Sequence, residues 1–152
     1  MAEQDPIRCM QLPLDGLQIL VPNAAVAEVI GYAEPEQPPQ GEPGLRGEIH
    51  WRGVMVPVIS VEALCGMPQG EPGPRSRIAI IYQPDGDREL PYLGIILRDI
   101  PRGYLADEGR MQLLLDGHDC PYLLGRADPM LDHLMVPDLD ALFDTVRRQR
   151  NG

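Results

Sequence analysis

Short apolar runs, each ended by glycine or proline, are the feature that most constrains how this chain can fold. The 152 residues include 16 Gly and 17 Pro, yet 43% of them are hydrophobic. This pattern is typical of short β-strands joined by tight turns, and the apolar content is too high for a disordered tail. A single domain of this length buries roughly 70% of its unfolded-chain surface. We therefore expect one domain rich in short strands.

Two pairs of apolar runs are predicted to form hairpins. Ile7–Leu14 and Leu17–Val21 are separated only by Asp15-Gly16, a dipeptide that accepts the positive φ angles of a type I′ turn. Ile78–Gln83 and Tyr92–Leu97 are dense apolar runs, and the turn-forming sequence PDGD follows the first of them. With weaker candidates the set reaches about nine strands, which predicts an all-β, barrel-type domain. The weaker candidates are Ile100–Leu105, Met111–Leu115, Pro121–Leu124 and His133–Val136.

Three polar residues are predicted to cap helices. Asn23 precedes the sequence AAVAEV and is expected to cap one or two helical turns that carry Val26 and Glu28. Ser60 is expected to open a short helix in the middle of the chain. Asp138 is expected to cap a C-terminal helix, because apolar residues follow it at helical spacing. Those apolar residues are Leu139, Leu142, Phe143 and Val146.

The stretch Leu45–Gly66 contains the most informative local pattern. Within it, Trp51-Arg52-Gly53 is predicted to form a turn between two apolar strands. Pro57 has no N–H to give to a sheet, so it is expected at a sheet edge or a bulge. Arg and Trp dominate many protein interfaces, which makes Arg52 a candidate anchor for a partner protein. The alternative stays open: Arg52 can instead lie along Trp51 or satisfy a nearby carbonyl group.

Acidic residues outnumber basic ones by 23 to 13, which gives a net charge of −10. This charge repels nucleic acid and anionic membrane surfaces, so no nucleic-acid partner is expected. The N-terminus lacks the basic start and apolar core of a signal peptide, and no apolar run approaches the ~18 residues of a membrane span. We therefore expect a cytoplasmic protein with no direct membrane insertion. Residues 34–44 hold four prolines and three glutamates and are expected to form an exposed loop outside the sheets.

The cysteines and histidines do not match a catalytic or metal-binding pattern. Cys9, Cys65 and Cys120 are odd in number and widely spaced, which favours reduced, mostly buried thiols. His118 and Asp119 precede Cys120 and resemble a base beside a nucleophile, but adjacent residues of a turn or strand point apart. No phosphate-binding loop is present, so we expect no catalytic residue, no metal site and no cofactor.

Several of these motifs resemble those of CheW-like chemotaxis coupling domains. Val26-Ala27-Glu28-Val29 is similar to the V-x-E-[IV] turn of that family. Gly47, Arg52-Gly53 and Pro57-Val58 follow the spacing of its G-x4-R-G-x3-P-V signature. Residues 78–81 and 94–96 resemble the paired strands of the second half of the domain. The likeness extends over residues 7–146, which are expected to form the domain, and 147–152 would be a basic tail.

The resemblance implies two small five-stranded barrel-like subdomains packed together, followed by the C-terminal helix, with no enzymatic activity. It further implies a cytoplasmic adaptor that couples methyl-accepting chemoreceptors to a CheA-type histidine kinase. The segments Trp51–Gly53, Ser60–Gly66 and Ile100–Arg102 look most like accessory CheW-like proteins of type IV pilus (twitching motility) systems. The alternative is a β-barrel protein-interaction module outside chemotaxis.

The resemblance also supplies candidate protein-binding residues. Val26 and Glu28 would lie near the receptor groove, and Arg52 with Gly53 would hold its geometry or contact the partner. Two positions depart from the family pattern. Ser60 stands where Asp is usual, which keeps the capping function, and Arg98 reverses the charge of an exposed Asp and so affects partner choice. The full set of candidates is Val26, Glu28, Gly47, Trp51, Arg52, Gly53, Pro57 and Arg98.

Overall fold

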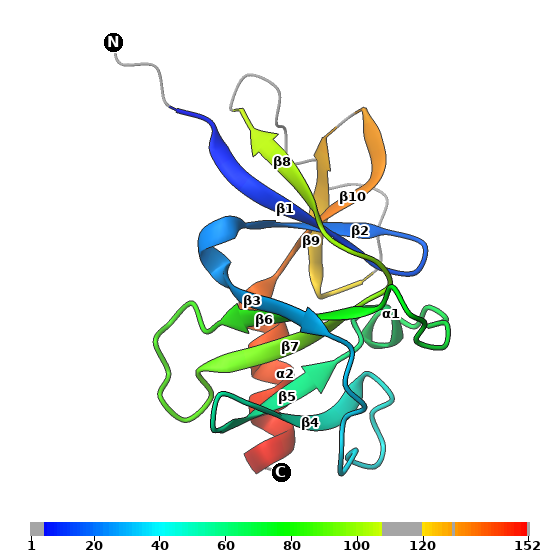
Figure 1. Ribbon diagram of the computed structural model, residues 1–152, viewed down its shortest axis with the longest axis vertical. Helices are drawn as coiled ribbons and strands as arrows, with labels where there is room; N and C mark the ends of the chain where they lie inside the picture. Colours follow the sequence, from blue (N-terminus) through cyan, green and yellow to red (C-terminus); the bar gives the residue numbers. More distant parts are fainter. Residues whose placement is uncertain (1–4, 108–119, 129, 152) are drawn as a thin grey trace.

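In the computed structural model, which describes residues 5–107, 120–128 and 130–151, ten strands form two five-stranded sheets. The sheets lie one above the other in Figure 1, and the C-terminal helix α2 (Leu139–Asn151) lies against the lower one. The predicted fold class, two barrel-like β-subdomains with a C-terminal helix, is confirmed. In order across the upper sheet, the strands are β8 (Arg102–Ala106), β1 (Ile7–Pro13), β2 (Gln18–Pro22), β10 (Leu131–Pro137) and β9 (Leu123–Asp128). In the lower sheet they are β3 (Val26–Gly31), β6 (Arg77–Tyr82), β7 (Tyr92–Leu97), β5 (Val54–Ile59) and β4 (Leu45–Trp51).

The chain begins in the upper sheet, crosses into the lower one and then returns. The lower sheet is built from one continuous stretch, residues 26–97, whereas the upper sheet combines β1 and β2 with strands from the second half of the chain. Each sheet contains one parallel pair, β2 with β10 and β5 with β7, and its other neighbouring strands are antiparallel. The two subdomains are therefore interleaved along the sequence.

Three groups of buried side chains hold the structure together. One fills the lower barrel and includes Trp51 and Ile80, and a smaller one fills the upper barrel around Leu20. The largest lies between the sheets and α2, and Ile81 and Phe143 belong to it. Strands β6 and β7 contribute to two of these groups because successive residues of a strand point to opposite faces. That is why their sequences are apolar almost throughout.

Both predicted hairpins are present, but the first turn differs from the prediction. β1 and β2 pair through Leu12 and Ile19, and the Leu14 N–H donates to the Leu17 carbonyl at 2.9 Å. Only Gly16 of the turn has a positive φ angle, 82°, so this is not a type I′ turn. The second hairpin pairs β6 with β7 over their full lengths.

The predicted helix after Asn23 is wrong. Residues Asn23–Ala25 form a single 3-10 turn, η1, and the chain is already in strand β3 at Val26. Val26 pairs with Ile81 of β6, and β-branched residues of β3 face the core. Sheet pairing with a buried neighbour outweighs the weak helix tendency of AAVAEV.

Pro57 was predicted at a sheet edge or a bulge. The edge is wrong, whereas the pairing of β4 with β5 does have a register shift, between Leu45 and Gly47, next to the Glu48–Pro57 pair. β5 lies between β7 and β4, and Pro57 is buried opposite Glu48. The Glu48 backbone forms two hydrogen bonds with Glu36, of 2.8 and 2.9 Å, so it needs no N–H from Pro57. Pairing of β5 with β7 begins only at Val58, one residue later. The loop 34–44 was expected to pair with no strand, and its Glu36 bridge to β4 corrects that too.

The predicted caps at Ser60 and Asp138 are confirmed. Ser60 Oγ accepts from the Ala63 N–H at 3.1 Å at the start of α1 (Val61–Leu64). Asp138 Oδ1 accepts from the Ala141 N–H at 3.1 Å at the start of α2. The α2 helix continues to Asn151, so the basic residues at the C-terminus belong to it.

The expectation of three reduced thiols is wrong, because Cys65 and Cys120 form a disulfide. Cys9 is free and buried, and burial raises the pKa of its thiol. Sequence spacing gave no indication of the pair, since 55 positions separate the two residues. His118, Asp119 and the weak strand candidate 111–115 lie outside the described residues. In the disulfide-bonded form, Cys120 is not available as the nucleophile of the group 118–120.

Candidate protein-interaction site

Three of the predicted residues meet at the turn between β4 and β5. The Trp51 Nε1–H donates to Glu28 Oε2 at 2.8 Å, and Arg52 Nη2 lies 3.3 Å from Glu28 Oε1. The Arg52 guanidinium carbon also lies 5.0 Å from the centre of the Trp51 ring, within the range of a cation–π interaction. Each carboxylate oxygen of Glu28 therefore has its own partner. Arg52 was expected either to contact a partner or to lie along Trp51. The two are compatible, because its guanidinium packs on the Trp51 ring and its side chain is still exposed.

The backbone of the turn explains how Arg52 becomes exposed. Trp51 and Val54 are paired across the hairpin, and the two residues between them have positive φ angles, 50° for Arg52 and 80° for Gly53. This is the left-handed conformation at both central positions that defines a type I′ turn. Gly53 adopts it without steric cost, whereas Arg52 adopts it despite its side chain. The Arg52 side chain is 67% exposed as a result.

A bulge in β3 brings Glu28 to this turn. The pairing with β6 shifts by one residue between Val26 and Glu28, so that Glu28 lies opposite Ile80. Ile80 points into the lower barrel, and residues opposite each other across a pair share a face, so Glu28 points the same way. Because β3 and β4 are the two edges of the lower sheet, the Glu28–Trp51 hydrogen bond joins one edge to the other and closes the barrel.

Trp51 is only 8% exposed and holds the base of this site. Its ring packs edge-on against Tyr92 with centroids 4.9 Å apart, and Tyr92 contacts Tyr82 at 5.8 Å. Tyr82, Val54 and Met55 are large apolar side chains that remain exposed on the same hairpins. We call the exposed residues Arg52, Val54 and Tyr82 the arginine face, since Met55 follows Val54 in β5 and points to the opposite side of the sheet.

Other predicted residues lie at or near this hairpin but inside the fold. Gly47 is buried with φ at 118°, and a Cβ there would overlap the carbonyl oxygen of Glu36. Pro57 is buried, and Val26 is half-buried against the core between the sheets. The Gly-to-Pro signature therefore lies along the β4–β5 hairpin, with only Arg52 and Gly53 exposed among its marked positions.

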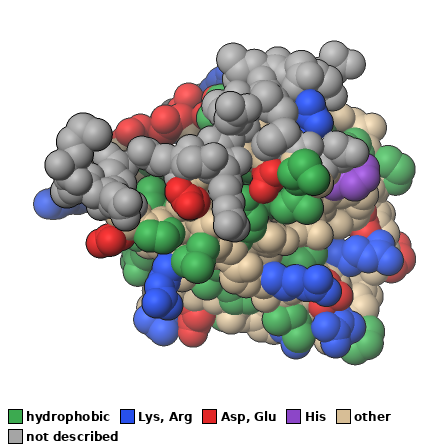
Figure 2. Space-filling model, turned by 90° about the horizontal axis from the view of Figure 1, so that it is seen from above, with side chains coloured by type: hydrophobic (Ala, Val, Ile, Leu, Met, Phe, Trp, Pro, Cys, Tyr) green, Lys and Arg blue, Asp and Glu red, His purple; other side chains and the backbone are tan. Residues whose placement is uncertain are grey.

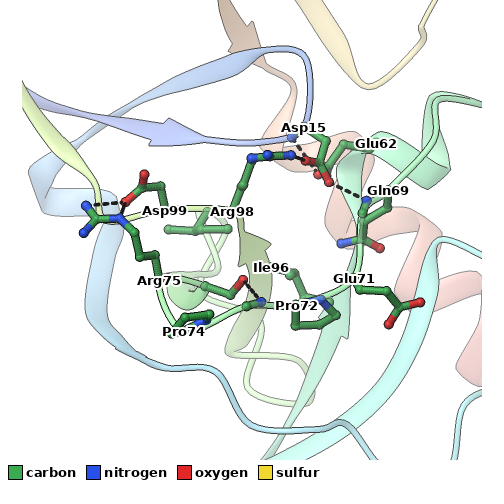
Figure 3. A pocket seen from close by; sticks show the side chains of 14 residues that line it. Asp15, Glu62, Gln69, Glu71, Pro72, Pro74, Arg75, Ile96, Arg98 and Asp99 are labelled. Atoms are coloured by element: carbon green, nitrogen blue, oxygen red, sulfur yellow. Dashed lines mark hydrogen bonds and ion pairs between the residues drawn. The ribbon is translucent and has the colours of Figure 1, made fainter.

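Arg98 lies elsewhere, on the rim of a cavity of about 490 Å³ at the junction of the two sheets. Figure 3 shows its guanidinium directed at Asp15 of the β1–β2 turn, with which it forms an ion pair. The Gly70 N–H donates to the same carboxylate at 2.6 Å. Burial opposes the charge on Asp15, but the Gly70 hydrogen bond and Arg98 outweigh it and lower the pKa of Asp15.

No sequence pattern indicated a role for Glu62, which lines this cavity. It is 1% exposed, its Oε2 accepts from the Asp15 N–H at 3.0 Å, and its Oε1 has no hydrogen-bond partner. Burial raises the pKa of Glu62. An acidic residue in the first turn of a helix usually indicates a solvated side chain that favours the helix dipole, and so the pattern pointed away from burial.

Charged side chains of both signs are interspersed over the face shown in Figure 2, with apolar side chains scattered among them. Across residues 5–107, 120–128 and 130–151, no cluster of three or more His, Cys, Asp or Glu is arranged to hold a metal ion. Within the same ranges, no helix has the length and apolar character needed to cross a membrane.

Two packed five-stranded subdomains with a C-terminal helix define a double-barrel β-domain. Residues 8–100, more than half of the chain, match the family model described as the CheW-like domain. The chain therefore belongs to the CheW-like family. Its fold is similar to that of the scaffolding protein TtCheW from Thermoanaerobacter tengcongensis, with a TM-score of 0.72 and 19% identity over 87% of this chain and 84% of that one. Among curated proteins no match was found.

Proposed function

We propose that this protein is a non-catalytic adaptor that couples methyl-accepting chemoreceptors to a CheA-type histidine kinase in the cytoplasm. Membership of the CheW-like family supports this role. The arginine face is the observation that links this adaptor role to particular residues. There Arg52 is exposed on a turn that Glu28 and Trp51 hold in place. Arg beside aromatic side chains is the composition in which interface hot spots are enriched.

The geometry favours Arg52 as a contact residue and Glu28 and Trp51 as the residues that position it. The exposed Arg52 ion pair adds little to folding, so its charge is available to an acidic partner. Val54 and Tyr82 are the exposed apolar side chains of the arginine face. A small interface of this kind is expected to bind weakly alone, and repeated copies within a receptor array would supply avidity.

A co-sedimentation assay with a CheA-type kinase and a receptor signalling fragment tests the proposal. Wild-type protein is expected in the pelleted complex. Arg52→Ala should weaken incorporation by ~2 kcal/mol or more, about thirtyfold, if the charge becomes buried and paired on binding. Arg75→Ala is the matched control, since Arg75 is as exposed as Arg52 and also pairs with one carboxylate, that of Asp99. Absence of the wild-type protein from the pellet would defeat the adaptor role and favour an interaction module outside chemotaxis.

The finer assignment, to accessory adaptors of type IV pilus systems, rests on the segments 51–53, 60–66 and 100–102. Arg98 is relevant to this assignment, because it places a positive charge at the junction cavity where the family usually has the negative charge of an Asp. We propose that Arg98 affects which receptor or kinase is accepted. Exchange of Arg98 for Asp should shift preference among kinases of flagellar and pilus systems, as compared in the same pelleting assay.

A further inference from the structure

The Cys65–Cys120 disulfide joins segments that belong to different sheets. Cys65 is the C-cap of α1, which closely follows β5 of the lower sheet, and Cys120 comes shortly before β9 of the upper sheet. Figure 1 places α1 at the junction of the two subdomains. Both cysteines are half-buried and pack against the core between the sheets. The disulfide is therefore a covalent link across the subdomain junction.

On the Cys120 side, the link continues into helix α2. Tyr122 lies two residues further on, and its carbonyl accepts from the Asp138 N–H at 2.8 Å, where α2 is capped. The Tyr122 hydroxyl accepts from Thr145 Oγ1 at 2.8 Å, one to two turns along the same helix. Movement of Cys120 would therefore displace Tyr122 and disturb the hydrogen bond from Asp138 at the start of α2.

On the Cys65 side, the link ends beside the junction cavity. Cys65 donates its N–H to the Val61 carbonyl at 3.0 Å, and so continues the single turn that carries Glu62. Glu62 in turn accepts from Asp15, the residue that pairs with Arg98. The disulfide and the Glu62–Asp15 hydrogen bond are thus two connections from the same helical turn to the upper sheet.

Packing across the junction does not depend on the disulfide. Ile59 and Val61 are fully buried, Phe143 is 1% exposed, and all three belong to the core between the sheets. Breaking one bond at the half-buried edge of this core leaves those contacts intact. Reduction is therefore expected to loosen α1 without unfolding the domain.

The third cysteine is set apart from this chemistry. Cys9 is buried in the upper barrel among Leu20, Ala106 and Leu134. Thiol–disulfide exchange requires a thiolate that reaches a sulfur atom, and Cys9 has neither the exposure nor the ionisation for it. Of the three cysteines, the half-buried pair is the accessible one.

We propose that Cys65 and Cys120 form a reversible thiol–disulfide site that clips α1 to the segment before β9, and that small dithiols and glutathione-type disulfides are its reaction partners. In reduction, a thiolate of the dithiol attacks one sulfur and the Cys65–Cys120 bond breaks, leaving a mixed disulfide. The second thiol of the reagent then displaces the protein sulfur. The protein gains two electrons and two protons as two thiols, and the reagent becomes a cyclic disulfide. Oxidation by a small disulfide runs in reverse and releases two small thiols.

Thiol counting tests the site directly. The full chain is equilibrated at a series of glutathione to glutathione-disulfide ratios, quenched, alkylated in denaturant and weighed by mass spectrometry. The expected result is a change from three alkylated cysteines to one in a single step, with peptide mapping placing the bond between Cys65 and Cys120. Cys9→Ala should change from two to none. Cys65→Ser and Cys120→Ser should each form no intramolecular bond.

A second measurement separates a reversible clip from an obligatory structural bond. The reduced wild-type protein should still unfold cooperatively in urea, and its amide exchange should rise in residues 61–67 and 120–123 while β6 and β7 remain protected. Three thiols at every ratio, or loss of the two thiols separately as mixed adducts, would refute the pair. Loss of cooperative unfolding on reduction would show that the bond is an obligatory structural one and would refute the clip.

Discussion

Removing the Glu28 carboxylate should destabilise the lower barrel, because this carboxylate accepts the hydrogen bond of the buried Trp51 indole. Glu28→Ala leaves the Trp51 indole N–H buried without an acceptor. A hydrogen bond to a charged group contributes about 1.5–3 kcal/mol, and the exposed Arg52 ion pair adds about 0–1 kcal/mol. Glu28 is about one-third exposed, so water can replace part of this contribution. The expected loss in the free energy of unfolding is about 2 kcal/mol.

Two further variants separate the contributions. Glu28→Gln keeps an oxygen that accepts from Trp51 but removes the ion pair, so it should cost only about 1 kcal/mol. Arg52→Ala removes the ion pair and the exposed cation–π contact, which together contribute about 1 kcal/mol. The double variant Glu28→Ala with Arg52→Ala should lose no more unfolding free energy than the two single variants lose together, because both single changes remove the same ion pair.

Urea unfolding measures all of these variants with one probe, since Trp51 is the only tryptophan of the chain and reports on the site itself. Arg75→Ala serves again as the control and should lower the urea midpoint only slightly, because it removes one exposed ion pair. If Glu28→Ala lies within about 0.5 kcal/mol of the wild type, the carboxylate does not hold the barrel closed. If Glu28→Gln is as unstable as Glu28→Ala, the charge and not the Trp51 hydrogen bond is responsible.

Three other changes have defined outcomes. Gly47→Ala should cost ~3 kcal/mol or more in urea unfolding, because its Cβ would overlap the Glu36 carbonyl oxygen and its φ angle is positive. Ser60→Ala should cost about 1 kcal/mol in the same measurement through the lost cap of α1, and Ser60→Asp should restore it. The raised pKa of Glu62 means that its contribution to stability is complete below the ordinary value of 4.5 and is lost as pH rises through the folded-state value. Glu62→Gln should therefore gain stability relative to the wild type as the pH rises above 4.5 in a series of thermal melts, and a difference that stays constant with pH would contradict the raised pKa.

Sequence reasoning succeeded where the determining interactions are local. The hairpin at Asp15-Gly16, the cap at Ser60 and the helix after Asp138 each depend on residues within a few positions of one another. The family motif also identified Glu28 and Arg52, which the structure brings within 3.3 Å. What no local pattern indicated was that Glu28 accepts from Trp51 across the closure of the barrel.

The errors have a common physical cause. Val26 is in a strand and Pro57 is in the interior of a sheet because of partners that are distant in the sequence, Ile81 for the first and Glu36, acting through Glu48, for the second. The Cys65–Cys120 pair depends likewise on how the two sheets come together. Propensity and spacing carry no information about such contacts, which the tertiary structure alone determines.

The interleaving of the two sheets has a consequence for synthesis on the ribosome. The lower sheet is complete once residue 97 has emerged, so it can fold while the rest of the chain is still being made. The β1–β2 hairpin, although made first, must wait for β8, β9 and β10 before its sheet is whole. Its parallel pairing with β10 closes a loop of more than one hundred residues, the kind of contact that slows folding. We expect the upper barrel to be the last part to form and the part most exposed to aggregation in a nascent or truncated chain.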